Sequence, residues 1–175
     1  MNRIYFLFCA GLIASCDHHV SAPDETKQVY EQLHGKYKAV SSVSSEAVDV
    51  NLDGTATNNI LSEIPELEQC DLEIRIVDKN NYLLAQFWPA QFFGYGPEPA
   101  GYDPSLVVKY AMQGETHAFS LRRTDDHIEV NGGNVVVTIE GEDTVKVVIM
   151  KRLYTSAGWK TTFITTVYSR YTMRT

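Results

Sequence analysis

The fold of this chain is decided by residues 144–154, which read TVKVVIMKRLY. Val145, Val147 and Ile149 occupy every second position, so one face of this segment is uniformly apolar while the other face is mixed. A period of two in β-branched residues predicts a β-strand rather than a helix. Residues 160–172 have the same alternation, again without a fully polar side. Two adjacent strands of this kind predict a sheet that is covered on one face and partly covered on the other.

Most of the remaining chain follows this pattern. Further candidate strands are residues 36–43, 70–77, 82–88, 105–112, 117–123 and a segment 127–140 that is broken at Gly132-Gly133. Short connections rich in turn formers join them, as antiparallel neighbours require, at residues 78–81, 113–115, 124–126, 141–143 and 156–158. Residues 26–33 have helical spacing, and Gly35 ends that helix. We predict an all-β fold, a single antiparallel up-and-down barrel of about eight strands after a short N-terminal helix; a two-sheet sandwich has the same periodicity and stays an alternative.

The start of the chain has a different composition. Residues 4–12 form an apolar run after Arg3, and Ala14, Ser15 and Cys16 follow Ile13. The run is about half of the ~20 residues that a helix needs to cross a bilayer. It resembles a bacterial lipoprotein signal peptide with its lipobox, which implies cleavage before Cys16 and acylation of that cysteine, palmitate included. An ordinary secretory signal with a chance cysteine is the alternative.

This resemblance implies three segments: a signal peptide at residues 1–15, the lipidated cysteine with a polar tether at 16–26, and one domain at 27–175. Asp17 resembles the inner-membrane retention signal of enterobacterial lipoproteins, whereas other Gram-negative groups sort by different rules. The expected location is therefore the bacterial cell envelope, facing the periplasm or the surface, with the choice between inner and outer membrane open.

Composition excludes several classes of function. The formal net charge of −7 becomes −8 when Arg3 leaves with the signal, and the basic residues are scattered, so nucleic acid is not an expected partner. Of three cysteines, only Cys70 remains outside the leader and its anchor, which predicts a buried thiol without a disulfide. The chain contains no G-x-S-x-G, no H-E-x-x-H and no paired-cysteine motif, so we do not expect an enzyme.

Two short motifs connect the domain to a known family. Residues 35–38 read GKYK directly after the predicted helix, and residues 167–171 read VYSRY in the last predicted strand. The layout resembles the calycin superfamily, in particular lipocalin-like domains of envelope lipoproteins. Lipocalins pack a tryptophan of the first strand under an arginine of the last, and Tyr37 and Arg170 occupy those places here as candidate barrel-closing residues. The resemblance implies a barrel that holds a small apolar or amphipathic ligand.

The most specific local motif is residues 49–54, DVNLDG, which resemble the start of a calcium loop of EF-hand or dockerin type. Side-chain oxygens at alternate positions can converge on one cation, and the glycine permits the sharp turn that follows. Position twelve is Ile60 rather than an acid, so the nearest following acid must complete the set. The candidate ligands are Asp49, Asn51, Asp53, the carbonyl of Thr55 and Glu63. An Asx-rich turn whose side chains cap their own backbone is the alternative.

One long connection, residues 88–102, is rich in aromatic residues, proline and glycine. Connections of this length are usually functional or disordered. Its candidate ligand-binding residues are Trp88, Phe92, Phe93, Tyr95 and Tyr102. They predict a lid over the mouth of the barrel; the alternative is a plug that fills the end of the barrel with Phe92 and Phe93.

From these observations we expect a membrane-anchored binding or accessory module for a small apolar or amphipathic ligand, with the membrane itself as its partner through Cys16. The alternative is a filled barrel, stabilised by calcium, that serves as a structural or interaction subunit of an envelope complex and has another envelope protein as its partner. No cofactor other than calcium is expected.

Overall fold

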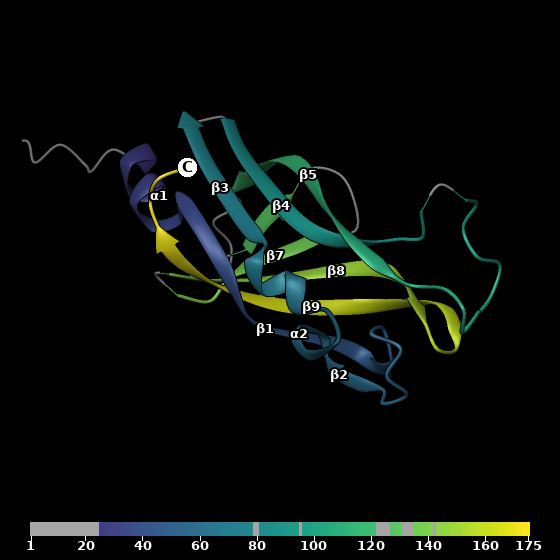
Figure 1. Cartoon of the computed structure of the whole chain (residues 1–175). Helices are drawn as coiled ribbons and strands as arrows, with labels where there is room; N and C mark the ends of the chain where they lie inside the picture. The colour runs from purple at the N-terminus through teal and green to yellow at the C-terminus, as the bar shows by residue number, and fades with distance from the viewer. Residues whose placement is uncertain (1–24, 79–80, 95, 122–126, 131–134, 142) are drawn as a thin grey trace, which may run out of the picture.

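A computed structural model describes residues 25–78, 81–94, 96–121, 127–130, 135–141 and 143–175, and the leader with Arg3, Cys16 and Asp17 lies outside them. The described elements are α1 (Glu25–Leu33), β1 (Gly35–Val48), β2 (Thr57–Asn59), α2 (Ile60–Glu63), η1 (Pro65–Gln69), β3 (Asp71–Asp78), β4 (Asn81–Phe92), β5 (Lys109–Leu121), β6 (His127–Val130), β7 (Val135–Ile139), β8 (Thr144–Thr155) and β9 (Gly158–Thr172) (Figure 1). The helices among them are too short or too polar to cross a membrane.

The strands close into a barrel. From β3 to β9 each strand pairs antiparallel with the next, and β1 pairs with β3 on one edge and with β9 on the other. Tyr37 shows the closure, because it has Leu72 of β3 and Arg170 of β9 as register partners. The ring contains eight strands, while β2 pairs only with the far half of β1. The predicted barrel is confirmed, and the sandwich is excluded.

One turn was predicted wrongly. Residues 113–115 were expected to separate two strands, but they lie inside the single strand β5, where Gly114 is the register partner of Phe87 on β4. A Cβ atom added to Gly114 would lie 3.0 Å from the Phe87 ring. The glycine therefore allows close packing of an aromatic ring rather than a chain reversal.

In the described part of the chain, alternate residues of β4, β8 and β9 are buried in the barrel interior. Val145, Val147 and Ile149 of β8 are all buried, as their period of two predicts. Across the interior, the Gln86 amide donates a hydrogen bond of 3.1 Å to the Tyr168 hydroxyl, and burial raises the pKa of Tyr168 to about 12. Each fully buried aliphatic side chain contributes about 1.5–3 kcal/mol, so this interior is the main source of stability.

Helix α1 covers one end of the barrel, next to the end of β9 (Figure 1). The Tyr37 hydroxyl donates a hydrogen bond of 2.6 Å to the Leu33 carbonyl at the last residue of the helix. Burial raises the pKa of Tyr37 to about 12. The Arg170 guanidinium donates to the carbonyls of Glu31 and Gln32 at 2.8 and 3.1 Å and to Asp143. Both residues predicted to close the barrel thus also hold the helix on it.

His34 connects α1 to the sheet. Its ring stacks on Tyr30 with the centroids 4.1 Å apart, and its Nδ1 accepts a hydrogen bond of 3.1 Å from the Ile76 amide. An accepting Nδ1 requires the neutral ring. Burial is the main cause that lowers the pKa of His34 below 6.5, and the charges of Arg75 and Arg170 lower it further, against Glu73.

We therefore expect acid to weaken the fold through His34. The neutral ring contributes stability above pH 6.5, and this contribution is lost as the pH falls through the lowered pKa, by at most about 1.4 kcal/mol per pH unit. Urea unfolding at pH 7.5 and 5.5 measures the loss. The variant His34→Asn keeps an acceptor near the Nδ1 position but does not titrate, so its free energy of unfolding should change less between the two pH values; an equal change would show that other groups are responsible.

Candidate functional site

The wall of the barrel is incomplete at the end opposite α1. Strands β6 and β7 are short and pair with each other; β6 also pairs with residues 119–121 of β5, and β7 with residues 145–149 of β8. In the described chain, residues 109–118 of β5 and 150–155 of β8 therefore have a strand partner on one side only. The barrel opens at this place.

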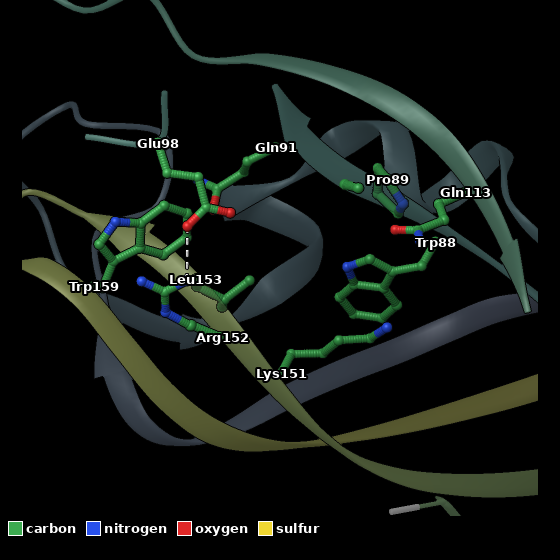
Figure 2. Close-up of a pocket in the computed structure, with 10 residues that line it drawn as sticks. Trp88, Pro89, Gln91, Glu98, Gln113, Lys151, Arg152, Leu153 and Trp159 are labelled. Carbon is green, nitrogen blue, oxygen red and sulfur yellow. Dashed lines mark hydrogen bonds and ion pairs between the residues drawn. The ribbon is translucent and has the colours of Figure 1, made fainter. Parts of the chain in front are cut away.

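A pocket of about 280 Å³ lies at this opening (Figure 2). Trp88 and Trp159 stand on opposite sides of it, with Leu153 between them. Trp88 and Leu153 are buried and form the inner wall, whereas Arg152 and Glu98 are exposed and form the rim. The lining residues are Trp88, Pro89, Ala90, Gln91, Glu98, Gln113, Lys151, Arg152, Leu153 and Trp159. The volume is near the lower end of the range for small-molecule sites, about 300–1,000 Å³.

A cation covers each tryptophan of the pocket. The Lys151 ammonium lies 5.3 Å from the centre of the Trp88 ring, and the Arg152 guanidinium lies 4.0 Å from that of Trp159. Both are within the distance at which cation–π attraction is significant. An apolar wall that carries two positive charges suits a molecule with an apolar part and an anionic group.

Each of these cations also has a carboxylate partner. Arg152 donates to Glu98 at 2.8 Å on the rim, and the Lys151 ammonium lies 3.6 Å from Glu115 on β5. The second pair spans the opening between β8 and β5. The Lys151 side chain is only 17 % exposed, so its charge is less screened than that of Arg152.

Gln91 covers part of the unpaired edge of β8. Its amide oxygen accepts a hydrogen bond of 2.6 Å from the Tyr154 backbone amide, and its amide nitrogen donates one of 2.8 Å to the Tyr154 carbonyl. A side chain thus replaces the missing strand at one residue, which protects an edge that could otherwise pair with another chain.

The connection between β4 and β5, here called the strap (residues 93–108), is fastened to the hairpin of β8 and β9. The Tyr154 hydroxyl accepts a hydrogen bond of 2.7 Å from the Asp103 amide and donates one of 3.2 Å to the Gly101 carbonyl. The Trp159 indole donates to the Pro99 carbonyl at 2.7 Å. Phe93 packs edge-on against Tyr154 and Trp159. The strap is held at several points along its length.

The five aromatic residues predicted to contact a ligand have different positions. Trp88 lines the pocket, and Phe93 supports its wall through Trp159. Phe92 and Tyr102 are 43 % and 45 % exposed, so Phe92 does not fill the end of the barrel. Tyr95 lies outside the described residues. The strap forms one side of the pocket, through Glu98, instead of a plug.

Sequence reasoning missed the charged half of this site. Lys151, Arg152 and Trp159 lie at the β8–β9 hairpin, where they read as ordinary residues of two strands. Their convergence with Trp88 depends on barrel closure, which brings β4 opposite β8.

Four of the five residues predicted to bind calcium lie in one loop, and the fifth, Glu63, contacts that loop from α2. The Asp49 carboxylate accepts from the Gly54 amide at 3.1 Å, and the Asn51 side-chain oxygen accepts from the Asp53 amide at 3.0 Å. Asp53 in turn accepts from the Thr55 amide at 2.8 Å. The Glu63 carboxylate reaches the loop from α2, where it accepts from Val50 and Asn51 amides at 2.7 and 3.2 Å. Calcium at this loop stays a prediction; the Asx turns of the alternative interpretation are present.

Groups that could support other chemistry are isolated. Cys70 is a buried free thiol, its pKa is raised by burial, and its sulfur lies 3.3 Å from that of Met112. His117 has its Nε2 atom buried without a hydrogen-bond partner, 3.7 Å from Glu115.

A comparison with known protein families, with curated protein sequences and with solved structures finds no match to this chain.

Proposed function

We propose that this protein is a lipid-anchored binding protein of the Gram-negative cell envelope, and that the pocket between Trp88 and Trp159 binds a small amphipathic molecule. The pocket is the single observation that carries the proposal. Its buried wall suits an apolar chain, and Lys151 beside Trp88 suits an anionic end. The anchor is proposed from the leader sequence alone, through acylation of Cys16.

The lipocalin-like resemblance agrees with a ligand site inside the mouth of a barrel. The pocket lies at that mouth, and Leu84 and Tyr168 are fully buried further inside the barrel. A small amphiphile fits a pocket of about 280 Å³ better than a long lipid does.

A second function, a structural subunit of an envelope complex, is favoured by a different observation. The strap is fastened by hydrogen bonds to Tyr154 and Trp159, so it does not have to move for the protein to be complete. In that case the pocket would be a surface depression that faces another envelope protein.

Tryptophan fluorescence separates the two functions. The chain has two tryptophans and both line the pocket, so a ligand there should change the emission. We expect decanoate, added below its micelle concentration, to shift or quench the emission in a saturable way. Lys151→Met should weaken decanoate binding about tenfold, because the lost charge-assisted contact is worth about 1.5–3 kcal/mol.

Lys146→Met is the matched control, since Lys146 lies on the same strand and pairs with Glu140 instead of facing the pocket. It should bind decanoate like the wild type. Decyltrimethylammonium should bind more weakly than decanoate. If neither amphiphile changes the emission, and native mass spectrometry finds no small molecule that copurifies, the structural subunit is the better proposal.

A further inference from the structure

We infer that residues 49–55, together with Glu63, bind a calcium ion that fixes the open end of the barrel. The inference is independent of the proposed pocket. It rests on two buried carboxylates that lie at one loop without a positive partner.

The first carboxylate is that of Asp49, which is 4 % exposed. One of its oxygens, Oδ2, accepts from the Gly54 amide on the other side of the loop, so the carboxylate is turned into the loop. The other oxygen, Oδ1, is buried and has no hydrogen-bond partner. A buried carboxylate oxygen without a partner is unfavourable, because the water it loses on folding is not replaced, and a bound cation would supply the missing partner.

The second carboxylate is that of Glu63, which is 1 % exposed. Its Oε2 atom accepts from two backbone amides of the same loop. Among the described residues neither Asp49 nor Glu63 forms an ion pair with a lysine, arginine or histidine. Two carboxylates are thus buried at the same loop, where both accept hydrogen bonds from its backbone amides.

The backbone of the loop suits a hard cation. Leu52 has φ +62°, the one non-glycine positive φ of the described residues, and Gly54 has φ +87°. These two positive φ angles turn the chain sharply within the loop. Asn51 and Asp53 follow Asp49 at alternate positions of the same loop. Each uses one oxygen to accept a backbone amide two residues ahead. Side-chain oxygens, a carbonyl and water are the ligands that calcium prefers.

The metal-free arrangement is not yet a complete site. No three His, Cys, Asp or Glu side chains of the described chain converge as ready metal ligands. Asp53 is turned toward Asn51, whose amide donates to its Oδ2 at 3.1 Å. Since Asp53 is exposed, it is free to rotate toward Asp49 when the cation binds.

Calcium at this loop would act on the open end. The Asp49 carbonyl accepts from the Ser156 amide at 3.1 Å, in the turn between β8 and β9. The Tyr110 hydroxyl lies 3.5 Å from the Val50 carbonyl, at the start of β5. A cation would therefore fix the loop between the two strands that border the opening.

The test is a titration of the purified protein after treatment with a chelator. We expect calcium to bind with a dissociation constant on the order of 10⁻⁴ M and to raise the midpoint of thermal unfolding by about 5 °C at 10 mM. Magnesium at the same concentration should raise it much less. Terbium should bind in place of calcium and luminesce on excitation of aromatic residues, because Tyr110 is adjacent.

Asp53→Ala changes an exposed side chain, so the variant should fold and bind calcium at least about tenfold more weakly. Asp49→Asn keeps an acceptor for the Gly54 amide and removes the buried charge; it should lose calcium binding while the chelated protein stays as stable as the wild type or becomes more stable. Asp103→Asn, in the Asx turn of the strap, is the matched control and should bind normally. The inference is overturned if calcium neither shifts unfolding nor competes with terbium up to 10 mM, or if both loop variants bind as tightly as the wild type.

Discussion

Replacing Arg170 with methionine is expected to lower the free energy of unfolding by about 3 kcal/mol. The guanidinium is only 11 % exposed and donates to carbonyls of α1 as well as to Asp143. Methionine keeps an unbranched apolar stem but leaves the last carbonyls of the helix and the Asp143 carboxylate without this donor. Urea unfolding measures the change, and loss of helical circular dichroism before the main transition would show that α1 detaches first.

Arg152→Met is the matched control. Like Arg170, Arg152 pairs with a carboxylate, here that of Glu98, but its side chain is 54 % exposed and lies over the ring of Trp159. Exposed ion pairs are worth at most about 1 kcal/mol. If both variants lose the same stability, the contacts of Arg170 with α1 do not hold the helix as argued.

Gly35→Ala is expected to cost at least about 3 kcal/mol. Gly35 has φ +147°, and an added Cβ would lie 2.4 Å from the Thr172 carbonyl oxygen and 2.9 Å from the side chain of Arg170. The backbone oxygen cannot move without breaking the pairing of β1 with β9. The variant should therefore lose stability through the seam of the barrel, and hydrogen exchange should become faster in β9.

Gly141→Ala serves as the comparison for this substitution. Nothing lies within 4 Å of the Cβ position at Gly141, and its φ is not positive. Its free energy of unfolding should stay within about 0.5 kcal/mol of the wild type. A similar loss in both variants would mean that the seam has room for a methyl group.

Local patterns predicted the strands because burial alternates along them. Val145, Val147 and Ile149 are buried, whereas the residues between them are only partly buried. This difference is visible in the sequence as apolar residues at every second position. Gly114 was misread as part of a turn because a glycine that admits the Phe87 ring and a glycine that reverses the chain look the same in sequence. The strand β2 was missed, since three residues are too few for a period of two.

The site was harder to predict because its parts are distant in sequence. Trp88 was singled out within an aromatic connection, but its partner Lys151 lies on a strand that reaches it only across the barrel. In contrast, Asp49 and Gly54 belong to one loop, so their contact follows from spacing alone. Contacts within one short loop can be predicted from the sequence. A pocket whose residues come together only when the barrel closes cannot be predicted in this way.

The pairing of β1 with β9 also has a consequence for how the chain folds. Ser42 and Thr166 hydrogen-bond across this seam, although 124 residues separate them. Contacts of such separation form late and slow the folding reaction, because the loop between them must close before any of their energy is gained. Until β9 is in place, the outer edge of β1 stays unpaired and α1 lacks Arg170. We therefore expect the pairing of β9 with β1 to complete the barrel last. Until this pairing forms, the unpaired edge of β1 can pair with another chain, so slow closure would favour aggregation.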